Sequence, residues 1–325
     1  MLTETHIPVA ISIDQIESAR DRIRGLVLRT PLVRLNIDDP DREIYLKLEN
    51  LQPTGSFKVR GASNAIALSG PEARTRGVYT CSAGNMAQAL AWRARLNRIP
   101  CTAIVPDNAP KTKLQAIQRF GAKIVQVSFD EVWKVATSRS YSPLTDSVFV
   151  HPFSDDRMIA GNGTIGLEII EDLDDVGSVI VPFGGGGLIA GIASAIHAKK
   201  PDTKVYAVEP ETASPLATSL HAGKPMDVDR IPSFVDGIGG KSVLPEMFRL
   251  VRPLIHGSIV SSLKEIADAV RLLVERNRVV AEGAGAASVA AAVSGKVGSG
   301  KIVCVVSGGN IDTSILTRIL SGERP

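Results

Sequence analysis

The sequence predicts an α/β fold of two interwoven lobes, with parallel-rich twisted sheets flanked by helices. Three observations support this prediction. The chain has 325 residues, a length at which a globular protein usually divides into two domains or lobes. Apolar strand patterns alternate with helical patterns along most of the chain, which is typical of a parallel sheet with helices on its faces. No low-complexity linker separates the two halves, so we expect the lobes to be interwoven rather than joined by a tether.

The N-terminal half begins with an amphipathic helical pattern over residues 13–26, in which Asp14 lies near the start and favours the helix dipole. A strand at 44–49 and a helix from about 57 to 68 follow. The chain then alternates between strands at 78–81, 101–105 and 123–127 and helices at 85–96 and 111–120. This repeated βαβ pattern predicts a parallel sheet in this part of the chain.

The C-terminal half repeats the pattern. We expect strands at 178–182, 204–209 and 302–306, helices at 188–198, 263–276 and 283–294, and a terminal helix after the last strand. Residues 212–253 contain many Gly and Pro residues and are expected to be irregular. The strands at 178–182 and 302–306 are mostly apolar, which is typical of strands covered on both faces. We expect a large domain of residues 1–54 and 150–325 and a small domain of residues 55–149.

The composition restricts the possible functions. Hydrophobic residues make up 44% and charged residues 22%, as in ordinary globular proteins. The net charge is only +3 and aromatic residues make up 4%, which argues against a nucleic-acid partner. No apolar stretch is long enough to cross a bilayer, and the first ten residues lack a signal-peptide pattern. The cysteines match no metal-site spacing and are expected to be buried free thiols in a reducing cytoplasm: Cys81, Cys101 and Cys304.

Four consecutive glycines, here called the glycine loop, lie between a predicted buried strand and a predicted helix: Gly184, Gly185, Gly186 and Gly187. Glycines allow a close approach of the backbone to a ligand, and with the following helix N-terminus they form a phosphate site. A dinucleotide also fits, because Gly185, Gly187 and Ala190 match the G-x-G-x-x-G/A pattern and Glu209 stands about 20 residues on, where an acid binds the ribose. This segment alone leaves a nicotinamide cofactor open.

Two further stretches favour a covalently held aldehyde cofactor. Ser56-Phe57-Lys58 follows a turn at 52–55 and opens an alanine-rich helical pattern. A lone lysine there is usually a solvated charge, and Arg60 is as readily a helix-face charge as a functional residue. The second stretch, Ser-Ala-Gly-Asn-Met at 82–86, follows a predicted strand. A nicotinamide enzyme needs neither stretch, whereas a cofactor with an aldehyde and a phosphate uses both a lysine and a glycine loop.

The order of these motifs closely resembles the serine/threonine dehydratase and serine racemase group. These are pyridoxal-phosphate (PLP) enzymes of the tryptophan synthase β-like fold, fold type II. The resemblance covers nearly the whole chain. Besides the glycine loop, the matching segments are Lys-Leu-Glu-Asn at 47–50, Gln-Pro-Thr-Gly-Ser-Phe-Lys at 52–58, Ser-Ala-Gly-Asn at 82–85, Ala-Gly-Asn-Gly-Thr at 160–164, Val-Glu-Pro at 208–210, Asp-Gly-Ile at 236–238, Glu-Gly-Ala-Gly-Ala at 282–286 and Ser-Gly-Gly-Asn at 307–310. Each is weak alone, but in this order they are highly specific.

The resemblance implies a role for each site residue. Lys58 would hold PLP as a Schiff base and, once released by the substrate, act as the proton-transfer base. Phe57 would pack on one face of the cofactor ring and Gly237 would line the other. Asn85 would hydrogen-bond the phenolic oxygen, and Ser307 would face the pyridine nitrogen and leave it neutral. The glycine loop would bind the phosphate. The substrate carboxylate would be received by a substrate loop of five residues: Ser82, Ala83, Gly84, Asn85 and Met86.

Three positions depart from the family's pattern. Met86 stands where the family usually has histidine, which supplies a flexible apolar side chain. Ala83 stands where the racemases carry a serine as second acid/base, which weakens a racemase interpretation. The family's divalent-cation site would use Glu209 and the backbone near Ala213, but its next carboxylate position is Pro215. We therefore predict no metal site.

These observations predict a PLP-dependent ammonia-lyase. It would convert a β-hydroxy-α-amino acid such as L-threonine or L-serine to a 2-oxo acid and ammonia by β-elimination. We expect a cytoplasmic homo-oligomer, a dimer or a tetramer, with neither a nucleic-acid nor a membrane partner. The chain ends soon after Ser307, so feedback inhibition by isoleucine through a C-terminal regulatory domain is not expected. The alternatives are a preference for bulky phenylserine, a serine racemase, and, from other classes, a nicotinamide-binding oxidoreductase or a binding protein without turnover.

Overall fold

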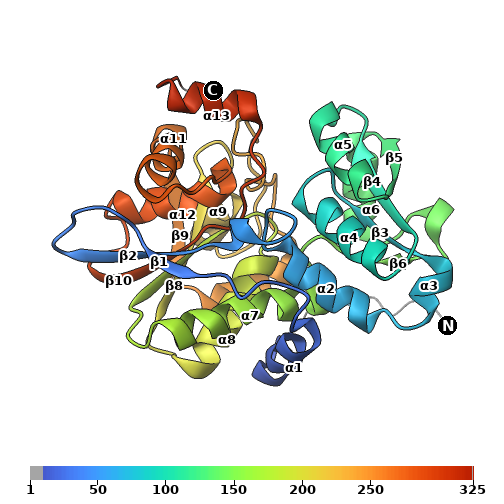
Figure 1. The fold of residues 1–325 in the computed structure, drawn as a ribbon, viewed down its shortest axis with the longest axis horizontal. Coiled ribbons are helices and arrows are strands. Elements are labelled where there is room, and N and C mark those ends of the chain that lie inside the picture. Colours follow the sequence, from blue (N-terminus) through green and yellow to red (C-terminus); the bar gives the residue numbers. More distant parts are fainter. Residues whose placement is uncertain (1–9, 324) are drawn as a thin grey trace.

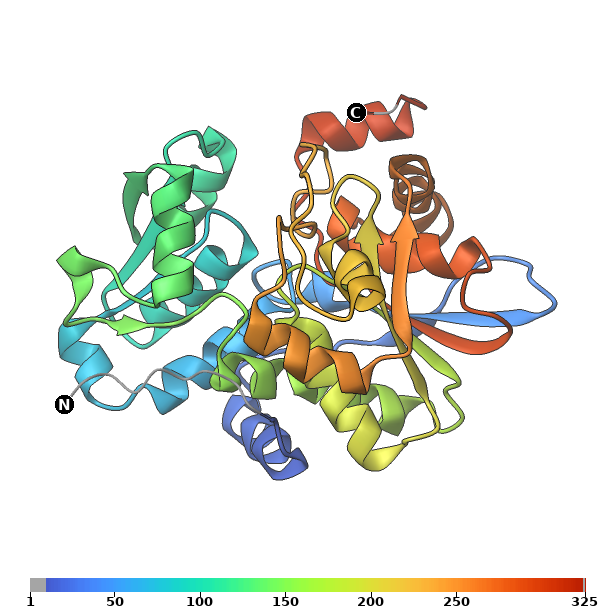
Figure 2. The same ribbon diagram turned by 180° about the vertical axis from the view of Figure 1, so that it is seen from behind.

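The computed structural model of the chain describes residues 10–323 and residue 325. Two lobes are each built around their own β-sheet, and in Figures 1 and 2 helix α2 (Lys58–Leu68) runs from one lobe toward the other. The sheets are parallel apart from one pair of strands, and helices flank them, which confirms the predicted α/β fold. The expectation about a signal peptide concerns residues 1–10, of which only residue 10 lies in the described part.

The large lobe contains a six-stranded sheet with the strand order β1-β2-β10-β7-β8-β9. Its strands are β1 (Leu32–Arg34), β2 (Arg42–Lys47), β7 (Ser178–Pro182), β8 (Lys204–Pro210), β9 (Gly257–Ser261) and β10 (Gly300–Val305). Strand β1 pairs antiparallel with β2, and the other neighbouring strands are parallel. Val179 and Val181 of β7 belong to one hydrophobic core and Ile180 to another, because successive side chains of a strand point to opposite faces. The strand is therefore covered on both faces, as predicted.

Helices cover both faces of the large sheet (Figure 1). The core on one face includes side chains of α1 (Ile13–Ile23), α7 (Asp156–Asp172), α8 (Gly187–Lys199), α9 (Pro215–Ala222) and α10 (Pro245–Val251). The core on the other face includes side chains of α11 (Leu263–Leu272), α12 (Gly283–Val293) and α13 (Thr313–Leu320). Helix α1 starts at a capping box, in which the Ser12 hydroxyl accepts from the Gln15 amide and the Gln15 side chain bonds back to the Ser12 amide.

The small lobe contains a parallel four-stranded sheet with the order β5-β4-β3-β6. Its strands are β3 (Val78–Cys81), β4 (Cys101–Pro106), β5 (Lys123–Val127) and β6 (Val148–Phe149), and its helices are α3 (Glu72–Arg76), α4 (Asn85–Leu96), α5 (Lys111–Arg119) and α6 (Phe129–Ser138). Its core also contains Met158 of α7. The lobes are thus interwoven, and the domain boundaries at 54/55 and 149/150 stay a prediction.

Helices α2 and α7 cross where both carry glycine. A Cβ atom on Gly61 would lie 2.8 Å from a backbone carbonyl oxygen of α7, and one on Gly161 would lie 2.7 Å from a carbonyl oxygen of α2. A Cβ atom on Gly163 would lie 2.9 Å from a side chain of α1 and 3.0 Å from a carbonyl oxygen of α8, and one on Gly166 would lie 2.8 Å from a carbonyl oxygen of α8. The Ala-Gly-Asn-Gly-Thr segment at 160–164 therefore serves close helix packing between the lobes, since no side chain fits at these contacts.

Some elements differ from the prediction. Residues 212–253, expected to be irregular, contain α9 and α10, which both start with proline, where the missing N–H costs no hydrogen bond. The predicted helix at 263–276 is α-helical only to Leu272 and continues as a π-helical turn (Leu273–Asn277). Helix α7 was not predicted; it contains Gly161, Gly163 and Gly166, and glycine has a low helix propensity. The helices α3 and α6 and the strands β1, β6 and β9 were also not predicted.

The structure also tests the expectations that the cysteines are buried free thiols and that no segment crosses a membrane. Cys81, Cys101 and Cys304 are buried free thiols, as predicted. Burial raises the pKa of all three thiols, for Cys81 and Cys101 to about 12, so they stay protonated at neutral pH. Within the described residues, no helix has the length and apolar character needed to cross a membrane.

Candidate active site

The glycine loop connects the carboxyl end of β7 to the first turn of α8, as predicted. Gly186 has φ +89°, a backbone conformation that other residues rarely adopt. Phe153 packs directly on the loop, since a Cβ atom on Gly185 would overlap its ring and one on Gly187 would overlap its carbonyl oxygen. The backbone N–H groups of such a loop at a helix N-terminus form an anion site.

Lys58 is the first residue of α2, and its side chain is half-buried. Its Nζ donates a hydrogen bond to the carbonyl oxygen of Pro152 at 2.5 Å and lies 5.0 Å from the centre of the Phe57 ring. Within the described residues no carboxylate pairs with Nζ. Burial therefore lowers the pKa of Lys58 to about 8. An amine of this kind loses its proton readily near neutral pH and serves as nucleophile and base.

Pro152 and Phe153 bring Lys58 and the glycine loop together. Pro152 accepts the hydrogen bond of Lys58, and the next residue packs on the loop. His151 shapes this turn, because its Nδ1 accepts from the backbone N–H groups of Phe153 at 3.2 Å and Ser154 at 2.8 Å. Its Nε2 lies 3.2 Å from the carbonyl oxygen of Ala136. Burial holds the pKa of His151 well below its usual value, so the ring is neutral and Nε2 donates.

The segment after β10 lies beside the start of α2. The carbonyl oxygen of Ser307 accepts from the Phe57 amide at 3.0 Å, and Ser56 and Gly308 form an antiparallel bridge. Ser307 itself is buried. These backbone contacts place Ser307 next to Phe57 and Lys58, although its implied role at the cofactor nitrogen stays a prediction.

Asn85 connects the substrate loop to the large lobe by a hydrogen bond. It begins α4, and its Nδ2 donates to Oε1 of Glu282 at 2.8 Å. The same Oε1 lies 3.5 Å from the position of a Cβ on Gly237, and the carbonyl oxygen of Gly237 lies 3.3 Å from a Cβ position on Gly184. The structure therefore brings together the substrate loop, the Asp-Gly-Ile segment and the glycine loop, all of which the sequence had singled out.

A comparison with known protein families decides the nature of this site. A model described as pyridoxal-phosphate-dependent enzyme matches residues 23–308. The chain belongs to this family. The enzyme is 42% identical over 316 residues to an L-threonine ammonia-lyase of Thermotoga maritima, an alignment that covers 96% of the chain and 78% of that relative.

Solved structures show the same relationship. The enzyme resembles the processed form of threonine deaminase isoform 2 from Solanum lycopersicum with a TM-score of 0.85 and 30% identity, over 99% of each chain. It resembles maize serine racemase with a TM-score of 0.84 and 33% identity, over 96% of this chain and 98% of that one. These comparisons confirm the predicted relationship, the fold type and PLP as the cofactor.

The residues of the enzyme fit PLP. Lys58 is a buried amine without an acidic partner among the described residues, which suits a covalent bond to an aldehyde. The glycine loop offers backbone N–H groups at the start of α8 for a phosphate. The Asn85 amide has two hydrogens, of which Glu282 accepts one, so the other is left for a cofactor oxygen.

The substrate loop divides into two parts. Ser82, Ala83, Gly84 and Asn85 are partly exposed, and the Ser82 hydroxyl accepts from the Gly84 amide at 3.2 Å. Met86 is only 2% exposed and belongs to the hydrophobic core of the small lobe. We therefore propose Ser82 to Asn85 as the substrate loop of the enzyme, and we propose that the Met86 side chain packs in the core and does not line the substrate site, where the sequence analysis placed it.

Glu209 was considered from the sequence as a ribose-binding or metal-binding acid, and in the structure three protein donors engage its carboxylate. Its carboxylate accepts from the backbone N–H groups of Leu216 and Ala217, both at 2.8 Å, and from the Ser258 hydroxyl at 2.6 Å. The side chain is fully buried. Glu209 binds the first turn of α9 and is not free to bind a ribose. The described residues contain no group of three His, Cys, Asp or Glu side chains that could hold a metal ion.

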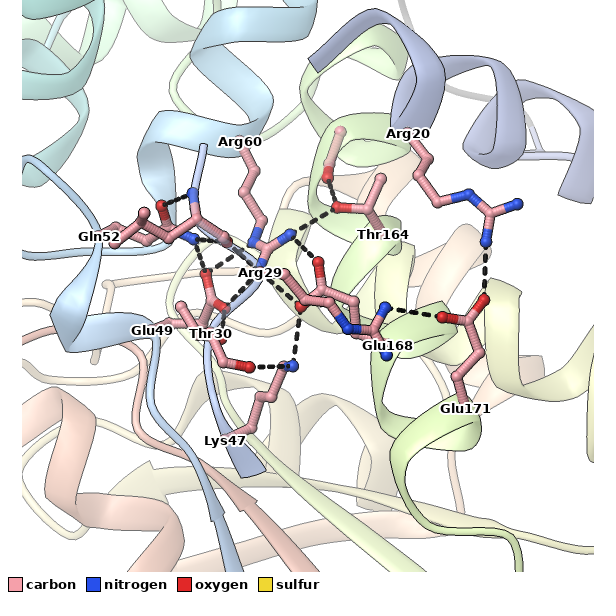
Figure 3. A network of polar contacts seen from close by, with 12 residues as sticks. Arg20, Arg29, Thr30, Lys47, Glu49, Gln52, Arg60, Thr164, Glu168 and Glu171 are labelled. Carbon is pink, nitrogen blue, oxygen red and sulfur yellow. Dashed lines mark hydrogen bonds and ion pairs between the residues drawn. The ribbon is translucent and has the colours of Figure 1, made fainter. Parts of the chain in front are cut away.

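Arg60, two residues beyond Lys58, lies at the centre of a buried polar network (Figure 3). Its guanidinium bonds Glu49 at 2.7 Å and Glu168 at 2.6 Å, and its side chain is 1% exposed. Lys47 also pairs with Glu168, at 2.7 Å, and Thr30 donates to Glu49 at 2.6 Å. The interpretation of Arg60 as a helix-face charge is therefore wrong. The network fixes the first turn of α2, which carries Lys58, against α7 and the segment after β2.

Replacement of Gly186 tests the glycine loop. We expect Gly186→Val to weaken PLP binding at least tenfold, since a β-branched residue at φ +89° costs roughly 1–2 kcal/mol and turns loop N–H groups away from the phosphate. The measurement is a titration of the PLP-free protein with PLP, followed by visible absorbance. Gly121→Val is a matched control, because Gly121 has φ +84° and open space around it. An equal loss of affinity in both variants would contradict a role of the loop in binding phosphate.

Proposed function

We propose that the enzyme is an L-threonine ammonia-lyase that also accepts L-serine, and that it releases 2-oxobutanoate or pyruvate together with ammonia. The observation that carries this proposal is the 42% identity, over 96% of the chain, to a relative with this activity. The Lys58 amine, which has no acidic partner among the described residues and lies beside a glycine loop, supports it, because β-elimination from an amino acid needs a base at the α-carbon.

Different residues of the chain have different roles in the proposed reaction. PLP, when bound, supplies an electron sink that makes the α-hydrogen of the substrate acidic. The Lys58 amine removes this hydrogen, and the Pro152 carbonyl oxygen orients Nζ. Ser82 to Asn85 bind the substrate carboxylate through hydroxyl and N–H groups, while the glycine loop binds the phosphate. Loss of the β-hydroxyl as water and hydrolysis of the resulting enamine complete the reaction, so one water leaves and one is consumed.

A panel of amino acids tests the proposal and the substrate preference together. Release of 2-oxo acid and ammonia should be measured for L-threonine, L-serine, D-threonine and phenylserine. We expect the highest kcat/KM for L-threonine and a value for L-serine about 10–200-fold lower, the usual worth of one methyl group in a pocket. Absence of 2-oxo acid from every compound would overturn the proposal, and a clear preference for phenylserine would overturn the substrate assignment.

A racemase is the second candidate, because the likeness to maize serine racemase extends over 96% of the chain. The wild type has Ala83 where a second acid/base is required, so we expect it to form D-serine at least about 10²-fold more slowly than pyruvate. Ala83→Ser places a hydroxyl in the partly exposed substrate loop and should raise D-serine formation. Chiral chromatography of serine after incubation measures both rates. Rapid interconversion of serine enantiomers by the wild type would favour the racemase.

Replacement of Met86 tests its assignment to the core. Met86→His would place a polar ring in an apolar environment, which costs roughly 1–3 kcal/mol and lowers Tm. The ratio of kcat/KM for phenylserine and threonine should stay unchanged, because the side chain does not face the substrate. Differential scanning calorimetry and the two assays measure these effects. A shift of the ratio toward threonine at unchanged Tm would contradict this assignment and show that Met86 contacts the substrate.

We further propose a homo-oligomer in the cytoplasm. Leu28, Leu51 and Val280 are 49%, 48% and 44% exposed and stand on neighbouring segments, so they form an apolar patch that a second subunit would cover. The segments that carry them are tied together, since Asn50 donates to the carbonyl oxygen of Val280 and Gln52 bonds the backbone of Leu28. Buried free thiols are typical of a reducing compartment. Light scattering of the purified protein measures its oligomeric state.

A further inference from the structure

Glu282 stands at the start of a helix, but its side chain does not cap that helix. It is the N-cap residue of α12, where a carboxylate normally accepts a hydrogen bond from the first turn, yet its side chain makes no such bond. The side chain instead reaches Asn85 of the small lobe at 2.8 Å. Its backbone N–H donates to Gly308 at 3.1 Å, which ties the start of α12 to the segment after Ser307. The residue is therefore oriented toward the site and not toward its own helix.

The Asn85 amide is fixed by two partners of opposite kind. Its Nδ2 donates to Glu282, and its Oδ1 accepts from Nδ2 of Asn310, each at 2.8 Å. Asn310 is itself held, because its Nδ2 also donates to the carbonyl oxygen of Thr54 at 2.9 Å. A reversed amide would place Oδ1 against the carboxyl oxygen and Nδ2 against another N–H donor. The contacts therefore select a single orientation of Asn85.

Two glycines make room for the carboxyl group of Glu282. A Cβ atom on Gly308 would overlap its Oε1, and one on Gly237 would lie 3.5 Å from it. Both glycines belong to segments that the sequence had singled out, Asp-Gly-Ile and Ser-Gly-Gly-Asn, as does Glu282 itself. The common feature of the three segments is this acid and the space around it.

We propose that Glu282 is a positioning residue for the reaction: its carboxyl group, together with Asn310, fixes the Asn85 amide and holds the substrate loop of the small lobe against the large lobe. Glu282 thereby leaves the second Nδ2 hydrogen of Asn85 directed at the cofactor. This inference rests on the proposed function, and it assigns no proton transfer to Glu282.

The charge of Glu282 provides a way to observe this role. The pKa of its carboxyl group is raised to about 7, mainly by burial and also by the charge of Asp236. Hydrogen bonds from Asn85 and the Asn310 backbone and the charge of Lys113 of α5 act in the opposite direction. Lys113 itself pairs with Asp236, so within the described residues no cation bonds the carboxyl directly. The group is therefore neutral below pH 7 and becomes anionic above it. An anion at this place repels the substrate carboxylate, so KM for L-threonine should rise with pH through about 7.

Three proteins test the proposal: the wild type, Glu282→Gln and Glu282→Ala. The readouts are kcat and KM from pH 6 to 9, the PLP affinity from visible absorbance, and hydrogen exchange of residues 82–90. Loss of the hydrogen bond in Glu282→Ala should raise KM about tenfold with kcat within about threefold, weaken PLP binding and speed exchange. Glu282→Gln keeps an acceptor for Asn85, so it should restore KM and slow exchange, and its KM should no longer rise above pH 7.

Other results would overturn the proposal. Wild-type KM, PLP affinity and hydrogen exchange in Glu282→Ala would show that Asn85 needs no support. A loss of kcat as large as that of a Lys58 variant, at unchanged KM, would make Glu282 catalytic and not positioning. If Glu282→Ala does not fold, a KM of Glu282→Gln that still rises above pH 7 contradicts the assignment. Failure of the proposed function is distinguishable, because the wild type would then form no 2-oxo acid, while PLP affinity and hydrogen exchange still report on Asn85.

Discussion

Lys58→Ala is expected to abolish both the visible absorbance of bound cofactor and the release of ammonia, while the fold stays intact. A general base contributes about 10²–10⁴-fold to a rate, and here the covalent attachment of PLP is lost as well, so turnover should fall at least roughly 10³-fold. The side chain contributes little to folding, since its amine has a single hydrogen bond, to Pro152. Absorbance, an ammonia assay and circular dichroism measure the three effects.

The direction in which Lys58→Ala changes the stability of the fold can be predicted. Burial lowers the pKa of Lys58 from its usual 10.5 to about 8 in the folded protein, so the folded state holds the charged amine less well than the unfolded chain does. This penalty is present below about pH 8 and disappears as pH rises toward 10.5, so PLP-free Lys58→Ala should have an equal or higher Tm at pH 7 than the PLP-free wild type. Lys111→Ala is the matched control, because Lys111 is the exposed first residue of α5.

Normal ammonia release by Lys58→Ala would contradict the role of Lys58.

Arg60→Leu is expected to have the largest effect on stability. The substitution leaves Glu49 and Glu168 buried without the guanidinium that bonds both, and breaking a buried ion pair in this way costs about 3–5 kcal/mol. Turnover should fall too, because the first turn of α2 carries Lys58 and loses its attachment to α7. Urea denaturation at pH 7 measures the loss of free energy of unfolding.

The pH dependence of this loss identifies its cause. Arg60 holds the pKa of Glu49 below its usual value in the wild type, so without Arg60 the carboxyl should become protonated at a higher pH. The cost of Arg60→Leu should therefore shrink between pH 7 and pH 5. Arg60→Lys should cost less than Arg60→Leu at pH 7, because it retains one charge but not the forked geometry. A loss below about 1 kcal/mol at pH 7, the usual range for exposed pairs, would contradict a buried network.

The parts of the site that follow from the sequence are those with a local signature. The glycine loop stands between a strand and a helix, and Lys58 and Asn85 stand at helix starts, so short segments were enough to single them out. The sheets followed from the alternation of strand and helix patterns. Helix α7 did not, because Gly161, Gly163 and Gly166 lower the helix propensity of its segment.

Other parts depend on contacts between distant segments. Arg60 meets Glu49 and Glu168, which are 11 and 108 residues away, and the pattern of α2 alone fits an exposed arginine equally well. Phe153 had no signal in the sequence, since only the fold places it on the glycine loop. Glu282 had a signal, its place in the Glu-Gly-Ala-Gly-Ala segment, but its partner Asn85 is 197 residues away.

The most direct test of the central claim is a mass balance for L-threonine with the PLP-loaded wild type. Each mole of threonine consumed should yield one mole of 2-oxobutanoate and one mole of ammonia, and the remaining threonine should keep its configuration. The same incubation with Lys58→Ala should leave threonine unchanged. Inversion of the α-carbon without 2-oxobutanoate, or consumption of threonine only when a nicotinamide cofactor is added and reduced, would contradict the assignment of the protein as a threonine ammonia-lyase.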